Sequence, residues 1–191
     1  MTSSETFHVV STELVVGSFS VSGLSFVFCL LLHLGWLKKD DWKPLFDHVA
    51  HFTLAFGLIA TPFAILSGLS SAPGDSLGSP LLVNKMLLSM TGMGFATGVF
   101  VSRFRLGKKV WQTGKSTVVH GIAGIAACES MLLTASIGGT FTRGESLLDA
   151  FQLPYDAVLL FPLAIGGTAL ILGTGMLVLG WLRTSPSSSV H

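Results

Sequence analysis

Four histidines have a residue type and a spacing that could do chemistry. They lie near the ends of long apolar segments and are His33, His48, His51 and His120. Because a helix rises about 1.5 Å per residue, counting from the segment ends places all four near one depth. Three separate segments contribute to this level. A haem b needs two neutral imidazoles from facing helices, and helix bundles hold such ligands in their cores.

The shared depth of these four histidines therefore predicts a cofactor-binding site, with haem b as the first candidate. Imidazole also suits copper, zinc and iron, and a single histidine can ligate the magnesium of a chlorophyll. His48 and His51 are three residues apart and share a helix face, so the better ligand pairs join His33 or His120 to one of them. The alternative is structural, because histidines at membrane boundaries also form hydrogen bonds between helices.

Glu129 is the second candidate for function. It lies near the middle of the apolar segment that begins close to His120. A carboxylate in that setting is costly, which makes it a candidate for a proton path or a transport site. The two residues are nine positions apart, about half a turn around the helix axis, so they do not share a face. A hydrogen bond to a neighbouring helix is the structural alternative.

Other chemistry has less support. Met86, Met90 and Met93 could form a thioether copper site, but no histidine lies at their depth. Cys29 and Cys128 lie inside apolar segments and offer no disulfide framework. The chain has no G-x-S-x-G, Walker or H-E-x-x-H motif. We therefore expect no catalysis by this chain alone.

Composition indicates the setting in which these residues act. Of 191 residues, 50% are hydrophobic and 11% are charged, and the mean hydropathy is +0.70. A typical soluble domain has about 25% charged residues, and a fold of this size leaves much of its surface exposed. These values exclude an ordinary soluble domain and a disordered chain. The net charge of +1 excludes a nucleic-acid binder. We therefore expect an integral membrane protein.

Five apolar segments are long enough to cross a membrane, since a span needs about 20 residues. They cover residues 13–37, 45–70, 81–104, 117–140 and 156–182. The sequence thus predicts an all-α bundle of five transmembrane helices in the cell membrane, forming a single domain over residues 1–183. The serine-rich tail, residues 184–191, is predicted to be disordered.

Basic residues predict the orientation. One side of the predicted bundle holds nine of them: Lys38, Lys39, Lys43, Arg103, Arg105, Lys108, Lys109, Lys115 and Arg183. The other side holds Lys85 and Arg143. This bias predicts a cytoplasmic carboxyl terminus and an amino terminus outside. Five spans, an odd number, also place the two termini on opposite sides of the membrane. The tryptophans Trp36, Trp42, Trp111 and Trp181 fall at the same cytoplasmic boundary.

Small residues at helical spacing predict close helix contacts. The third segment carries Met86, Met90, Gly94, Gly98 and Ser102, each four residues apart. The fourth segment carries His120, Ala123, Gly124, Ala127 and Met131 on one face. We expect these faces to pack within the bundle or against neighbouring subunits.

The end of the fourth segment carries a family resemblance. The stretch 135–144, Ala-Ser-Ile-Gly-Gly-Thr-Phe-Thr-Arg-Gly, resembles the last-helix signature of a family of four-helix prokaryotic membrane proteins of unknown function. The end of the second segment, residues 64–69, is similar to that family's second helix. The resemblance covers about residues 8–146 and implies a four-helix core, with the fifth helix as an addition.

These features predict a small accessory subunit of a larger membrane complex, in an energy-transducing or redox system. Its partners would be other membrane subunits and the lipid bilayer, with no nucleic acid, and helix packing would be its main contribution. Two alternatives stay open. One is an electron-transfer subunit that binds haem b through the four histidines. The other is a small transporter or proton channel that uses Glu129.

Overall fold

The computed structural model describes residues 4–71, 79–112, 114–146, 149 and 152. All of them belong to one compact unit, Met1–Val158. The second unit, Leu159–His191, lies outside the described residues. The predicted fifth span, 156–182, and the predicted tail, 184–191, also lie outside them.

The described residues form four long helices, which confirms the all-helical class. They are α1 (Ser4–His33), α2 (Lys43–Ser71), α3 (Pro80–Leu106) and α4 (Gly114–Arg143). Two short 3-10 helices, η1 (Asp40–Trp42) and η3 (Gly107–Trp111), precede α2 and α4. Three of the long helices, α1, α2 and α4, are long and apolar enough to cross a membrane.

The third predicted span is a helix of the expected length, but α3 is less apolar than the other three. Its 27 residues include Asn84 and Lys85 near the start and Arg103 and Arg105 near the end. Serines, threonines and glycines occupy much of the stretch between them. Length and hydropathy therefore do not by themselves mark α3 as a span, in contrast to α1, α2 and α4.

The first helix ends at His33, four residues before the predicted boundary at residue 37. Gly35 has a φ of +73°, a conformation that glycine adopts without strain. The Trp36 amide donates to the Leu31 carbonyl at 3.0 Å, and the Gly35 amide donates to the Leu32 carbonyl at 3.2 Å. This pair of hydrogen bonds is the Schellman motif, which closes a helix and turns the chain toward α2.

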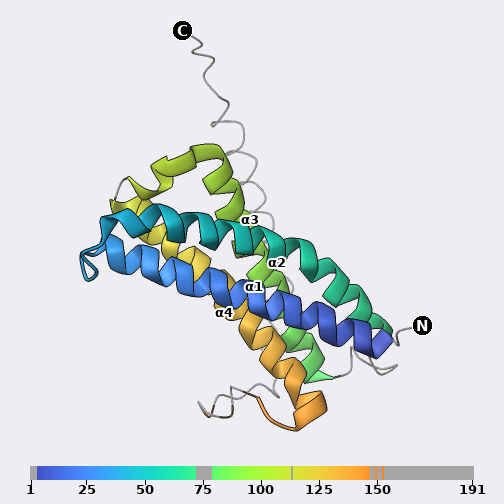
Figure 1. Ribbon diagram of the computed structural model, residues 1–191. Helices are drawn as coiled ribbons and strands as arrows, with labels where there is room; N and C mark the ends of the chain where they lie inside the picture. The colour runs from blue at the N-terminus through green and yellow to red at the C-terminus, as the bar shows by residue number, and fades with distance from the viewer. Residues whose placement is uncertain (1–3, 72–78, 113, 147–148, 150–151, 153–191) are drawn as a thin grey trace, which may run out of the picture. The chain divides into compact units, whose positions relative to one another are not determined.

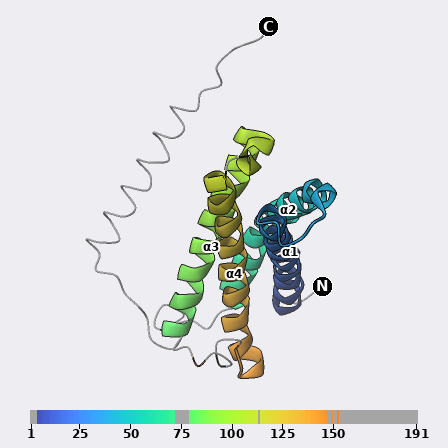
Figure 2. The same cartoon turned by 90° about the vertical axis from the view of Figure 1, so that its left-hand side faces the viewer.

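Consecutive helices pair in space. Figure 1 shows α1 and α2 lying side by side and running in opposite directions. Figure 2 shows the same antiparallel relation for α3 and α4. The two pairs meet mainly where α1 packs against α4, and α2 also contacts α3. Phe19, Phe26 and Ala127 are fully buried in the core that results.

Inside the described unit, α3 packs through residues other than the predicted Gly94–Gly98 step, and packing of that step against a neighbouring subunit stays a prediction. Gly92, Ala96 and Val99 are the buried residues of α3, and a Cβ atom at Gly92 would lie 2.8 Å from the side chain of Met131. Gly94 and Gly98 are exposed, and a Cβ atom at either position would have no neighbouring atom within 4 Å. Within the described part of the chain, the Gly94–Gly98 face therefore makes no close helix contact.

The face predicted for α4 does pack inside the unit. Gly124, Ala127 and Met131 are buried, and Ala123 is half-buried. A Cβ atom at Gly124 would lie 2.6 Å from the ring of Phe26. The glycine therefore lets an aromatic side chain of α1 reach the backbone of α4.

Candidate functional site

Two of the predicted histidines meet in the core. His51 of α2 and His120 of α4 bring their Nε2 atoms to 2.9 Å, a hydrogen-bond distance. Their rings are nearly parallel, with centroids 5.1 Å apart and an interplanar angle of 19°. Both side chains are buried. Because one nitrogen must donate and the other accept, a single proton lies between the two rings.

Asp47 anchors the pair on the side of His51. It lies one helical turn before His51 on α2 and is 3% exposed. His51 Nδ1 lies 2.8 Å from the Asp47 carbonyl oxygen and 3.1 Å from its Oδ1 atom. Both of these oxygens can only accept, so His51 Nδ1 carries a proton and donates it to Asp47.

The carboxylate of Asp47 also joins α2 to the end of α3. Arg103 donates from Nη2 to Oδ2 at 2.6 Å and from Nε to Oδ1 at 3.1 Å. Trp111 of η3 donates from Nε1 to Oδ1 at 2.6 Å. The guanidinium balances the carboxylate charge, which a buried acid needs if it is to stay ionised. Removal of either partner would leave the other charge without compensation.

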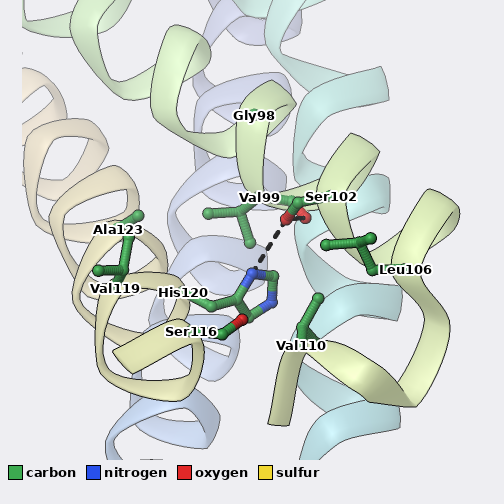
Figure 3. A pocket seen from close by; sticks show the side chains of 9 residues that line it. All are labelled: Gly98, Val99, Ser102, Leu106, Val110, Ser116, Val119, His120 and Ala123. Carbon is green, nitrogen blue, oxygen red and sulfur yellow. Dashed lines mark hydrogen bonds between the residues drawn. The ribbon is translucent and has the colours of Figure 1, made fainter. Parts of the chain in front are cut away.

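On the other side of the pair, the hydrogen bonds end at a serine of α3. His120 Nδ1 lies 3.0 Å from Ser102 Oγ. The same Oγ atom lies 2.8 Å from the Val99 carbonyl oxygen, to which it can donate. Figure 3 shows Ser102 and His120 facing each other between α3 and α4. The polar chain is thus Asp47, His51, His120 and Ser102, and we call it the Asp–His–His–Ser chain.

Aromatic side chains enclose the two imidazoles. Phe26 of α1 presents its ring edge-on to His51 at 5.2 Å and to His120 at 6.0 Å between centroids. Trp111 lies edge-on to His120 at 5.1 Å. An apolar enclosure strengthens hydrogen bonds inside it and makes any unpaired polar atom costly. The described part of the chain contains no buried side-chain nitrogen or oxygen without a partner.

These positions admit several arrangements of protons, among them a neutral one and one that contains an imidazolium. In the neutral one, Ser102 donates to His120 Nδ1, His120 Nε2 donates to His51 Nε2, and His51 Nδ1 donates to Asp47. In the other, His120 Nδ1 donates to Ser102, which donates to the Val99 carbonyl, and His51 Nε2 donates to His120 Nε2. His51 is then an imidazolium beside Asp47. The two arrangements differ by one proton and need no movement of heavy atoms.

His33 and His48 lie away from this chain. His33 is the last residue of α1 and is half-buried. His48 is exposed, and its Nδ1 atom lies 2.5 Å from the carbonyl oxygen of Pro44 on the same helix. The structure therefore brings together two of the four predicted histidines, in the predicted combination of His120 with one residue of α2.

The pair does not fit opposite ligation of a haem iron in this arrangement. An imidazole nitrogen lies about 2 Å from a bound metal, so opposite ligands would be about 4 Å apart. The His51 and His120 Nε2 atoms are separated by 2.9 Å and bonded to each other. In the described residues, no three histidine, cysteine or acidic side chains are grouped to hold a metal ion. The haem alternative gains no support from this geometry.

Glu129 lies on another face of α4. Its side chain is exposed, whereas its neighbour Cys128 is buried near Gly23 of α1. The expected separation from His120 is therefore observed. The described residues do not enclose Glu129 in a site.

Sequence reasoning missed the role of Asp47. The signal was present, because an acid four residues before a histidine on a helix shares its face. From the sequence, Arg103 counts only as a basic residue of the predicted cytoplasmic side and Trp111 only as a tryptophan of the same boundary. Both instead donate to Asp47, and Trp111 is 8% exposed. These pairings join residues more than fifty positions apart, which no local pattern reveals.

Comparison with protein-family models, with curated proteins and with solved structures finds no match. The resemblance to the four-helix membrane family stays a prediction.

Proposed function

We propose that this chain is a small accessory subunit of an energy-transducing or redox membrane complex, in which the His51–His120 pair takes up and releases one proton. The fifth span and the orientation expected from the basic residues are part of the proposal. In that orientation the pair lies in the cytoplasmic half of the membrane.

The observation that carries the proposal is the 2.9 Å hydrogen bond between two buried imidazoles. A contact that only joins helices needs one donor and one acceptor, as Ser22 supplies when it donates to the Ala50 carbonyl at 2.8 Å. Imidazole is the side chain that changes charge near neutral pH. Two of them in direct contact, ending at an ionised carboxylate, form a site suited to hold an added proton.

The outer surface supports membrane location. Large apolar side chains are exposed along the helices, among them Leu24 at 62%, Phe52 at 73% and Ile59 at 67%. A soluble monomer rarely exposes large contiguous apolar patches, whereas a lipid-facing or subunit-facing surface requires them. Glu129, which is exposed on α4, offers a further contact point to neighbouring subunits.

The proposal can be tested by magnetic resonance on the full chain in lipid bilayers, with ¹⁵N-labelled histidine. We expect a nitrogen–nitrogen coupling across the His51–His120 hydrogen bond. On acidification, the pair should take up one proton and show one imidazolium and one neutral ring. His48→Gln is the matched control, because it removes an exposed histidine one turn from the site and should leave the coupling unchanged.

Two results would contradict the proposal. One is the absence of coupling between the two rings in the folded chain. The other is a pair of rings that each titrate independently, as two exposed histidines would. Either result would show that His51 and His120 only make ordinary contacts between helices.

A further inference from the structure

An apolar cavity lies at the Ser102 end of the Asp–His–His–Ser chain. It has a volume of about 270 Å³ and is formed by α3, η3 and α4. Figure 3 shows that most of its lining side chains are aliphatic, including Val99, Leu106, Val110 and Val119. No lining residue is acidic, lysine or arginine. The cavity therefore suits a neutral, largely apolar molecule.

The cavity reaches the apolar outer surface of the helices. Val119 on its rim is 69% exposed, and Gly98 on the opposite wall is exposed with no atom within 4 Å of a Cβ position. A molecule dissolved in the bilayer can enter between them. Ligand cavities usually measure about 300–1,000 Å³, so this one suits a small ring system.

The polar end of the cavity offers an acceptor and no spare donor from the histidine chain. Ser102 uses its one hydroxyl proton on His120 Nδ1 or on the Val99 carbonyl. A hydroxyl oxygen has two lone pairs, and in the neutral arrangement neither is used within the Asp–His–His–Ser chain. A molecule that binds to Ser102 therefore has to bring its own hydrogen-bond donor.

We propose that this cavity binds a membrane-dissolved aromatic alcohol, with its ring among the aliphatic side chains and its hydroxyl donating to Ser102 Oγ. The aliphatic lining suits an apolar ring, and the lone pairs of Ser102 Oγ suit a ligand that brings its own donor, whereas the hydroxyl of Ser116, which also lines the cavity, can either donate or accept. Binding in this manner needs no change at His51 or Asp47.

The test uses 1-naphthol as probe and 1-methoxynaphthalene as its matched control, which lacks the donor. Fluorescence anisotropy of each probe is measured with the full chain in nanodiscs and with empty nanodiscs. We expect 1-naphthol to bind about three- to tenfold more tightly than the methoxy compound, the gain from one hydrogen bond. Ser102→Ala should reduce naphthol binding to the level of the methoxy compound.

Gly98→Leu fills the cavity mouth and should reduce binding of both probes to the level of empty nanodiscs. Gly94→Leu is the control, because this glycine is also exposed on α3, has free space around it and does not line the cavity. Equal binding of both probes to the unmodified chain would overturn the proposal, and so would naphthol binding that survives in a folded Gly98→Leu variant. The magnetic resonance test of the His51–His120 pair uses no naphthol. A negative result there would contradict the proposed function, whereas a negative result in the naphthol measurement would contradict only the proposed binding cavity.

Discussion

Asp47 sets the electrostatics of the histidine pair. Its carboxylate accepts hydrogen bonds from Arg103 and Trp111 and lies within reach of His51 Nδ1. Because Arg103 already neutralises it, the carboxylate does not require His51 to be charged.

Replacement of this carboxylate should be costly. Asp47→Asn keeps the side-chain shape but leaves Arg103 without its counter-charge, and removal of one partner of a buried ion pair costs about 3 kcal/mol. We expect a clear fall in the free energy of unfolding, measured by circular dichroism of the helices in mild detergent. The control Asp41→Asn, at an exposed position of η1, should change the free energy of unfolding by less than about 0.5 kcal/mol.

A double variant separates the interaction energy of the Asp47–Arg103 ion pair from the other effects of the two substitutions. If Asp47 acts through Arg103, combining Asp47→Asn with Arg103→Gln should cost less than the sum of the two single changes. Strict additivity would show that the two charges do not stabilise each other.

The hydrogen bond between His51 and His120 also leads to a spectroscopic expectation. To bind a haem iron as opposite ligands, the two Nε2 atoms would have to move from 2.9 Å to about 4 Å apart, which would break their hydrogen bond. We expect the purified chain to show no b-type α band in a reduced-minus-oxidised visible spectrum. A stoichiometric band that disappears in His120→Gln but persists in His48→Gln would contradict this and restore the haem alternative.

Helical counting predicted the depth of the four histidines but not which of them meet. Depth follows from a rise per residue, which is the same for every helix. Rotation about the helix axis depends on the buried face, and that is decided by partners such as Phe26 against Gly124. His48 and His51 show the difference, because they are close in depth while one is exposed and the other is buried.

At the scale of the helices, close approach depends on particular glycines. Gly124 admits the Phe26 ring, which in turn lies edge-on to both histidines. The sequence identified the packing face of α4 correctly because its small and apolar residues coincide. On α3 it selected the Gly94–Gly98 step, whereas Gly92 and Ala96 are the buried positions. Spacing alone does not distinguish a glycine needed for contact from one on an exposed face.

This distinction gives a matched pair of substitutions. Gly124→Ala places a methyl group 2.6 Å from the Phe26 ring, and overpacking of this kind costs about 1–3 kcal/mol. Gly94→Ala meets no neighbouring atom and should stabilise its helix by up to about 1 kcal/mol through lower backbone entropy of unfolding. Thermal unfolding in the same detergent measures both. Equal effects of the two changes would show that the Phe26 contact is unimportant.

At the scale of the whole molecule, sequence composition predicted an all-helical protein with spanning segments, and α1, α2 and α4 agree with that prediction. Mean hydropathy was sufficient because these helices are apolar along most of their length. For α3 it was insufficient, since polar residues at both ends and small residues between them lower its hydropathy. Because α3 pairs antiparallel with α4 (Figure 2), we propose that α3 crosses the same layer.

Reporter fusions test whether α3 spans the membrane. We expect alkaline phosphatase to be active when fused after Ser76 and green fluorescent protein to be fluorescent when fused after Lys109, since the basic residues near Lys109 favour the cytoplasm. Opposite reporters active at the two ends of α3 would establish the span. The same reporter active at both positions would show that α3 does not cross.

The ion pair between α2 and α3 has a consequence for biogenesis. α2 leaves the ribosome before α3, so Asp47 is synthesised well before Arg103 exists. An acidic side chain on a segment entering the bilayer alone is disfavoured by up to about 3 kcal/mol. On the proposed membrane location, Asp47 would have no counter-charge until Arg103 is made. The ion pair would then favour docking of the α3–α4 hairpin against the α1–α2 hairpin.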